Sequence, residues 1–279
     1  MERVLSVQDL SCAGRCSLTV ALPVISSMGC RCTVLPTAVL STHTGFPNPF
    51  VRDLTEDIAP ICAHWKQTDA QFDVISIGYL SDPRQSQAIE ALLDSFSGYP
   101  ILDPVMGDGG KLYGRITPAH IQAMLHLTGR VKLLLPNVTE AAALSGIAYR
   151  ETRDPEYYRA LARKLLTLGP EAVVITGVSL SEGKTGFLVL DAQGEYFYQA
   201  KKHPRAFHGT GDLFSAVITG GLASGIPLRE AAVLAAGFVE RAISGTREQG
   251  PYGVEFEKQL PWLWQKMQSS GCSCACPGF

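Results

Sequence analysis

A glycine-rich turn that ends in an acidic residue is the stretch of this chain best suited to chemistry. It consists of Gly209, Thr210, Gly211 and Asp212 and runs into an apolar helical pattern. The two glycines let the backbone turn its N–H groups toward one point, and the helix that starts near Asp212 adds the positive end of its dipole. The turn therefore predicts a phosphate site.

Asp212 would give that phosphate site a specific chemistry. A carboxylate repels a neighbouring phosphate, so its presence there suggests a task, namely accepting the proton of an attacking hydroxyl group. The alternative is that Asp212 only caps a helix, where an acidic residue is favourable in any case. From these four residues alone the cap is the simpler interpretation, so the rest of the chain has to decide.

The elements that must position this turn alternate in type along the chain. Strand-like apolar runs cover residues 3–8, 32–40, 74–78, 100–105, 131–135 and 172–176. Helical patterns follow them, and two further runs, 186–190 and 195–199, suggest a hairpin around Gly194. This alternation predicts an α/β fold with a mainly parallel central sheet, flanked by helices on both faces in three layers.

Polar residues stand at or just after the ends of five of these runs. They are Asp9, Tyr79, Asp103, Asn137 and Thr176. Each alone is more often a loop residue without a role, but ligands of open α/β sheets bind at the carboxyl ends of parallel strands. We therefore expect these side chains to gather along one edge of the sheet.

Composition limits the classes of partner. The 279 residues carry a formal net charge of −2, with 46% hydrophobic residues, and we expect one domain over residues 1–270. This balance gives no basic footprint for nucleic acid or an anionic membrane surface. The first residues show no signal-peptide pattern and the apolar run near 231–239 is too short to span a bilayer, so a cytoplasmic location is expected.

The eight cysteines do not suggest a disulfide framework in a chain of this length. We expect five of them to be reduced, buried thiols: Cys12, Cys16, Cys30, Cys32 and Cys62. The other three, Cys272, Cys274 and Cys276, alternate in the tail 271–279, and this spacing favours a disordered tail over a zinc site.

Two common nucleotide motifs are absent. The segment from Gly177 to Thr185 looks like a P-loop, but five residues separate its glycines where that motif has four, and a strand-like run follows it. No dinucleotide glycine fingerprint follows the first strand, which argues against a nicotinamide dehydrogenase. Phosphoryl transfer without a P-loop remains.

Taken together, the motifs resemble those of the pyridoxal kinases in the ribokinase-like superfamily, from about residue 3 to residue 268. The matching pieces are VLSVQ at 4–8, STHTGF at 41–46, GY at 78–79, DPVMGD at 103–108, PN at 136–137 with Glu140, VIT at 174–176, and GTGD at 209–212. The resemblance implies a homodimer and transfer of the γ-phosphate of ATP, with Mg²⁺, to the 5′-hydroxymethyl group of pyridoxal, pyridoxine or pyridoxamine. It also leaves room for a monovalent cation.

The resemblance assigns a role to each matching residue. Asp212 resembles the catalytic base, and Gly209, Thr210 and Gly211 resemble the anion hole. The positions that contact the vitamer are matched by Asp9, Thr44 and Tyr79. The ATP side is matched by Asp103, Tyr113, Asn137, Glu140 and Thr176, with Asp103 and Glu140 also on the metal side, through water. Glu140 as a mere helix-terminal residue, or Tyr79 as a core residue, is the structural alternative.

Asp9 departs from the pyridoxal kinase pattern, which has serine at this position. The segment DLSCAG at 9–14 is also similar to the start of hydroxymethylpyrimidine kinases of the same superfamily. Those enzymes commonly carry cysteine where this chain has Asp212, so hydroxymethylpyrimidine is the alternative substrate. A catalytically silent vitamer-binding protein is a further alternative, and the intact GTGD motif argues against it.

Overall fold

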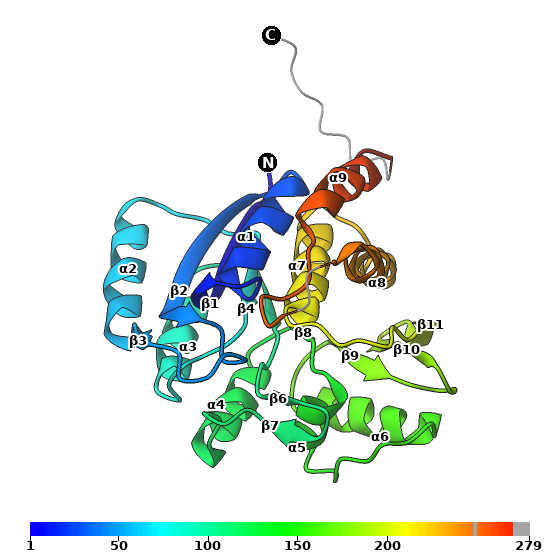
Figure 1. Cartoon of the computed structure of the whole chain (residues 1–279). Helices are drawn as coiled ribbons and strands as arrows, with labels where there is room; N and C mark the ends of the chain where they lie inside the picture. The colour runs from blue at the N-terminus through cyan, green and yellow to red at the C-terminus, as the bar shows by residue number, and fades with distance from the viewer. Residues whose placement is uncertain (248–249, 270–279) are drawn as a thin grey trace.

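The alternation of strand and helix patterns produces a nine-stranded sheet covered by helices (Figure 1). The computed structural model describes residues 1–247 and 250–269. The strands are β1 (Arg3–Ala13), β2 (Arg31–Thr42), β3 (Val51–Asp53), β4 (Val74–Ile77), β5 (Tyr99–Leu102), β6 (Gly107–Asp108), β7 (Lys111–Leu112), β8 (Leu133–Leu134), β9 (Ala172–Val178), β10 (Lys184–Asp191) and β11 (Gly194–Lys201). The helices are α1 (Leu18–Ser27), α2 (Thr55–Gln67), α3 (Gln85–Ser95), α4 (Pro118–Thr128), α5 (Val138–Ser145), α6 (Pro155–Leu166), α7 (Thr210–Ala223), α8 (Leu228–Gly245), the 3₁₀ turn η1 (Glu257–Gln259) and α9 (Leu260–Ser269).

The sheet order is β11-β10-β9-β8-β5-β4-β1-β2-β3. The six strands from β9 to β2 are parallel to one another, while the hairpin β10–β11 and the short β3 run antiparallel at the two edges. The expected mainly parallel sheet is thus confirmed. A separate two-stranded ribbon, β6–β7, follows β5.

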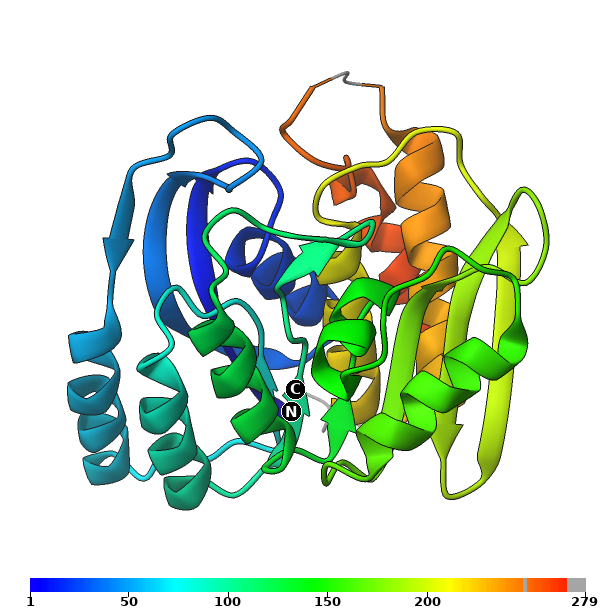
Figure 2. The ribbon, with the colours of Figure 1, turned by 90° about the horizontal axis from the view of Figure 1, so that it is seen from below.

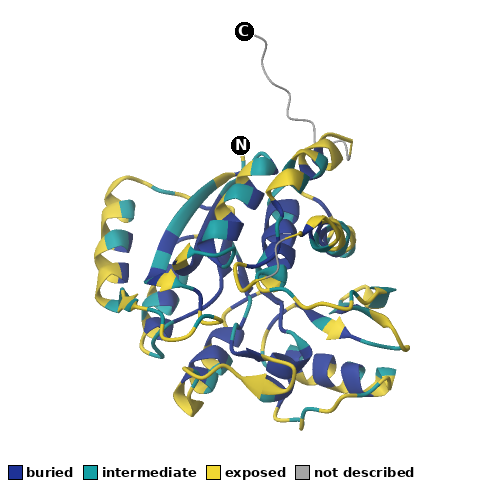
Figure 3. Ribbon diagram, in the orientation of Figure 1, coloured by how far each residue is buried: buried dark blue, intermediate teal, exposed yellow. Residues whose placement is uncertain are grey.

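Side chains of successive strand residues enter two different cores. Val4 and Val174 pack with α1, α7 and α8, whereas their neighbours Leu5 and Ile175 pack with α2 to α6. Figure 2 shows these two helical layers on opposite sides of the sheet, and Figure 3 shows that the buried residues lie between them. Burial on both faces explains why the central strands read as continuous apolar runs.

The first strand continues beyond its expected end. It was expected to stop at Gln8, with Asp9 just after it, but β1 extends to Ala13 and Asp9 is 4% exposed. The register shifts between Gln8 and Leu10, next to Pro36 of β2, which has no N–H to donate to the ladder. Such a bulge re-aims side chains without ending the strand.

Smaller corrections concern element ends. Residues 81–83 do not start a helix with Pro83 at its first position, because α3 begins only at Gln85, and α7 begins at Thr210 rather than Asp212. The hairpin around Gly194 and the helix starting at Pro118 are confirmed.

The cysteine expectation is partly wrong. The five thiols within the described residues are free, but only Cys30 and Cys62 are buried; Cys12 is exposed, and Cys16 and Cys32 are intermediate. The tail 271–279 lies outside the described residues. Within the described residues, no helix has the length and apolarity needed to cross a bilayer.

Candidate active site

A cavity of about 850 Å³ opens above the carboxyl ends of the parallel strands. Every residue to which the sequence assigned a role lines this cavity: Asp9, Thr44, Tyr79, Asp103, Tyr113, Asn137, Glu140, Thr176, Gly209, Thr210, Gly211 and Asp212. They come from both halves of the chain and lie together because parallel strands end at a common edge. The structure thus groups all of the expected site residues in one place.

The glycine turn forms the start of α7 at the floor of this cavity. Gly209 has φ 82°, and a Cβ there would lie 2.1 Å from the carbonyl oxygen of Arg15, so this position requires glycine. At Gly211, by contrast, φ is not positive and a Cβ would meet no atom within 4 Å. The expectation that both glycines shape the backbone is therefore wrong for Gly211. The first-turn N–H groups of α7 have no intrahelical acceptor, which suits an anion.

Asp212 lies in this first turn and faces the cavity. The Cys16 thiol donates to its Oδ2 atom at 3.3 Å. Burial raises the pKa of Asp212, while nearby polar groups, the Cys16 thiol among them, oppose that rise. A carboxylate with a raised pKa is closer to the basicity that proton transfer at neutral pH requires.

Asp9 is a second buried carboxylate, on β1. Its Oδ2 accepts a hydrogen bond from the Ser11 hydroxyl at 2.8 Å. Burial raises its pKa to about 6, and the nearby charge of Asp212 contributes to the rise. The hydrogen-bond partners found for Asp9 are neutral, so a cationic group on a ligand would be a favourable partner.

On the opposite wall, α5 positions the acidic residue Glu140. Asn137 caps the helix by accepting from Thr139 and Glu140, while the Glu140 carboxylate accepts the N–H groups of Asn137 at 2.8 Å and Met106 at 2.9 Å. Burial raises the pKa of Glu140 to about 7 despite these hydrogen bonds. Glu140 is therefore a helix-terminal residue and a cavity residue at once.

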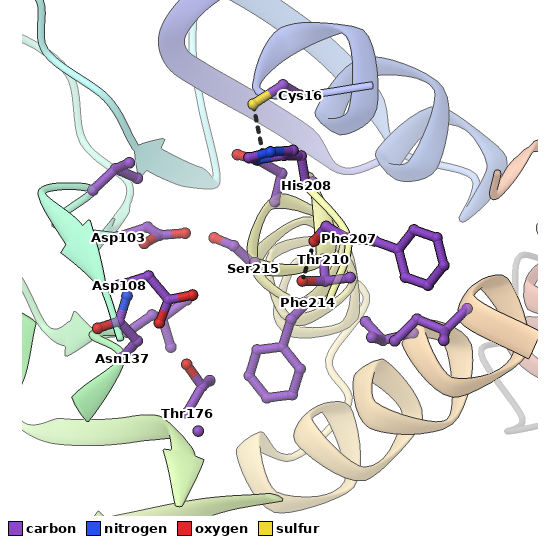
Figure 4. Close-up of a pocket in the computed structure, with 18 of the residues that line it drawn as sticks. Cys16, Asp103, Asp108, Asn137, Thr176, Phe207, His208, Thr210, Phe214 and Ser215 are labelled. Atoms are coloured by element: carbon purple, nitrogen blue, oxygen red, sulfur yellow. Dashed lines mark hydrogen bonds between the residues drawn. The ribbon is translucent and has the colours of Figure 1, made fainter. Parts of the chain in front are cut away.

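Asp103, at the end of β5, completes the acidic wall. Burial together with the charges of Glu140 and Asp212 raises its pKa, and nearby Ser215 of α7 opposes that rise. Figure 4 shows Asp103, Asp108 and Ser215 around the same space, with Asn137 and Thr176 beside them. Thr176 of β9 lies next to Asn137 through an isolated β-bridge.

The remaining expected residues form the rim. Tyr79 is 6% exposed, its carbonyl accepts from Thr37 at 2.9 Å, and burial raises its pKa. Thr44 and Tyr113 are exposed residues at the cavity edge. The partial burial of the Tyr113 phenol group raises its pKa. Tyr79 is thus both a packed residue and part of the cavity wall.

Comparison with known proteins decides the family. The family described as phosphomethylpyrimidine kinase matches residues 20–255. The chain belongs to this family.

Individual members of the family and its relatives agree with this assignment. A pyridoxine/pyridoxal/pyridoxamine kinase of Bordetella bronchiseptica is 30% identical, with 88% of this chain and 90% of the relative covered. The crystal structure of pyridoxal kinase from Lactobacillus plantarum has a TM-score of 0.88 and 33% identity, covering 96% and 99% of the two chains. A candidate phosphomethylpyrimidine kinase from Bacteroides thetaiotaomicron, crystallised with pyridoxal, has a TM-score of 0.89 and 33% identity, covering 96% of each chain. The resemblance to pyridoxal kinases and the ribokinase-like fold are confirmed, and the protein is a kinase.

Several cavity residues of this phosphomethylpyrimidine kinase family member were missed in the sequence. One group is an apolar slot between the edge hairpin, α7 and α8: Phe187, Tyr198, Phe207, Phe214, Val239 and Ile243. These residues sit in ordinary apolar patterns, so only the fold reveals that they face the cavity.

A histidine pair closes the other end of the cavity. The rings of His43 and His208 lie 4.7 Å apart, His43 Nδ1 accepts the Gly45 N–H at 3.1 Å, and its Nε2 lies 2.5 Å from the Pro251 carbonyl oxygen. These contacts fit a neutral His43 with its proton on Nε2. Burial lowers the pKa of His208. The pair joins the loop after β2 to the turn that precedes α7.

Proposed function

We propose that this kinase transfers the γ-phosphate of ATP to the 5′-hydroxymethyl group of pyridoxal, pyridoxine or pyridoxamine, as in vitamin B6 salvage. The observation that carries the proposal is a single cavity lined by the carboxylates of Asp9, which is 4% exposed, and Asp212, together with Thr44 and Tyr79. One carboxylate suits the ring of a vitamer and the other its hydroxyl group. The B6 kinases among the relatives support this choice of substrate.

In this reaction Asp212 accepts the proton of the 5′-hydroxyl group. The oxygen forms its bond to the γ-phosphorus as the bond from that phosphorus to the bridging oxygen of ADP breaks. The N–H groups of Thr210 and Gly211, together with the positive end of the α7 dipole, stabilise the negative charge on the transferred phosphoryl group. The chain thus mainly positions the reactants and neutralises charge.

Asp9 would hold the vitamer through its ring nitrogen. A protonated pyridine nitrogen can donate a charge-assisted hydrogen bond to the buried carboxylate, which supplies the cationic partner that Asp9 lacks. Thr44 and Tyr79 complete the wall on this side. The apolar slot at the other end, together with Tyr113, Asn137 and Thr176, is proposed to hold ATP.

The charge of the cavity favours a divalent cation as part of the reaction. Among the described lining residues six are carboxylates and two are lysines: Asp9, Asp103, Asp108, Glu140, Asp212 and Glu240 against Lys201 and Lys202. These carboxylates would repel the triphosphate group of ATP unless a cation bound with it. The described residues hold no cluster of three or more metal-ligating side chains.

Mg²⁺ fits this donor set, because it keeps several waters and is usually bound by one or two carboxylates and the substrate phosphates. Asp103 and Glu140 would hold it through water, since the Glu140 carboxylate already accepts backbone N–H groups. When bound, Mg²⁺ neutralises phosphate charge. A monovalent cation remains an option that no observed contact supports.

A coupled assay of ADP release tests the proposal. It compares pyridoxal, pyridoxine, pyridoxamine and hydroxymethylpyrimidine at equal concentrations with Mg²⁺ and ATP. We expect turnover with at least one B6 vitamer to exceed turnover with hydroxymethylpyrimidine. Hydroxymethylpyrimidine is the second candidate substrate because a relative that is 27% identical is a hydroxymethylpyrimidine/phosphomethylpyrimidine kinase, and preference for it would overturn the proposal.

The resemblance also supplies proposals for the whole protein. They are a homodimer and a cytoplasmic location, with small-molecule substrates and no nucleic-acid or membrane partner. Light scattering tests the first, for which we expect a mass near twice the 30.0 kDa of one chain.

A further inference from the structure

The turn between β1 and α1 contacts the general base although it has no place in the sequence motifs. The turn consists of Cys16 and Ser17, both of which line the cavity. The Cys16 thiol donates a hydrogen bond to Oδ2 of Asp212 at 3.3 Å. The turn thus supplies a donor to the group that is proposed to take the proton.

Ser17 contacts the thiol and not the carboxylate. Its hydroxyl group donates to the Cys16 sulfur at 3.8 Å. The Cys16 thiol therefore lies between the Ser17 hydroxyl group and the carboxylate of Asp212.

The backbone of the turn is strained in a way that this arrangement explains. Ser17 has φ 50° and ψ −126°, a conformation that favours glycine. It is maintained by neighbouring contacts: Thr19 Oγ1 accepts the Cys16 N–H at 3.2 Å and lies 2.7 Å from the Cys16 carbonyl oxygen, and Ala21 donates to the Ser17 carbonyl at 2.9 Å. Strain of this kind persists where the surroundings over-determine it, commonly at functional sites.

The chemistry of Cys16 suits a donor and not a nucleophile. Burial and the charges of Asp212 and Asp9 raise the pKa of the thiol, so it keeps its proton. A thiol is a weak donor. It can therefore fix the orientation of a carboxylate while reducing its basicity less than a strong donor would.

We propose that Cys16 is a positioning residue for the proposed transfer: its thiol orients the carboxylate of Asp212. The inference rests on the proposed role of Asp212 as the base. It adds one residue that acts through Asp212.

The test compares Cys16→Ala with Cys16→Ser, using Cys12→Ala as the matched control. Cys12 is an exposed thiol on β1 outside the cavity lining. Loss of a hydrogen bond to a charged group should lower kcat roughly 5- to 30-fold in Cys16→Ala, with the KM for ATP unchanged. Cys16→Ser keeps a donor and should recover most of that loss. Equal kcat in wild type and Cys16→Ala, or equal loss in both Cys16 variants, would overturn the inference.

A double-mutant cycle separates this inference from the proposed function. If Cys16 acts through the base, Cys16→Ala should have no further effect in an Asp212→Asn background. A loss that multiplies in the double variant overturns the positioning role and leaves the base intact. If Asp212→Asn alone leaves kcat unchanged, the proposed base is wrong, and the inference that depends on it is overturned as well.

Discussion

The surroundings of Asp212 decide which roles this residue can have. Asp212 lies in the first turn of α7, where its charge favours the helix dipole, but Gly209 and not Asp212 is the N-cap, so the interpretation of Asp212 as a cap is wrong. Asp212 also lines a cavity together with the buried Asp9. Stabilising the start of α7 and acting as the base are therefore compatible roles, and they differ in the turnover that they predict for a variant.

Asp212→Asn should lower kcat by about 10²- to 10⁴-fold, the usual scale of general acid–base assistance. The amide keeps the size of the side chain, so ATP binding and the unfolding midpoint should change little. Steady-state kinetics with ATP and pyridoxal, together with calorimetric titration of ATP, measure both effects. Turnover near that of wild type would show that Asp212 only stabilises the start of α7.

Asp9 predicts a pH-dependent stability. Its pKa is raised from 3.8 to about 6 in the folded chain, so the folded state retains a proton that the unfolded chain has lost. Stability is therefore lost as pH rises from about 4 to about 7, by up to about 3 kcal/mol from this group. Asp9→Asn should remove that loss, so that the variant gains stability relative to wild type across this window.

Urea unfolding of the protein without ligands, at several pH values in that window, measures the difference between the two chains. Other buried carboxylates with raised pKa, such as Glu140, affect both chains equally and cancel in the difference. If the free energy of unfolding changes with pH in the same way for wild type and Asp9→Asn, the pKa of Asp9 is not raised in the folded chain. Asp9→Asn should also weaken binding of a vitamer with a protonated ring nitrogen.

At the scale of elements, the start of α7 contains two glycines with different reasons to be glycine. Gly209 is required by its positive φ and by the nearby Arg15 carbonyl oxygen, whereas Gly211 has free space around its Cβ position. The space beside Gly211 belongs to the cavity. We therefore expect a ligand, and not the fold, to limit the size of the side chain at position 211.

This difference predicts opposite results for two variants. Gly211→Val should leave thermal stability near that of wild type while turnover collapses, because the side chain enters the space for phosphate. Gly209→Ala should lower stability by more than about 1 kcal/mol, because alanine is strained at positive φ and meets a backbone oxygen. Differential scanning fluorimetry and the coupled assay on both variants give the comparison. A fully active Gly211→Val would exclude the turn as a close phosphate contact.

The sequence predicted those elements whose pattern is local. The hairpin around Gly194 and the helix that starts at Pro118 are defined by turn and cap residues near in sequence. The short strands β3, β6 and β7 have two or three residues and no periodicity to detect. The sequence predicts too early an end for β1, because an aspartate usually marks the end of a strand. Only the structure shows that Asp9 continues the strand and lies buried beside a cavity.

The same limit applies to the site. Residues within recognisable motifs, such as Glu140 and Thr176, were placed correctly at the cavity. The sequence predicts only a buried thiol at Cys16, because the proposed role of this residue depends on its hydrogen bond to Asp212, which is 196 positions away in the chain. Contacts of that kind are a product of the fold and leave no pattern in the residues around them.

At the scale of the whole molecule, a parallel sheet with two apolar cores brings the two ends of the cavity together. Strands β1 and β4 carry the proposed vitamer side, while β8, β9 and the edge hairpin border the proposed ATP side. Helix α7 crosses between them and presents Asp212 at the junction. We therefore expect the phosphate donor and acceptor to meet beside Asp212, the proposed base.

The most direct test of this arrangement is the identity of the product formed from pyridoxal, ATP and Mg²⁺ by the wild-type protein. Phosphorus NMR with proton coupling identifies the atom that carries the new phosphate. The account predicts one new phosphomonoester resonance, split by the two protons of the 5′ methylene group, that grows as ADP forms. ADP formation without that resonance, or a phosphate attached elsewhere on the vitamer, would contradict it.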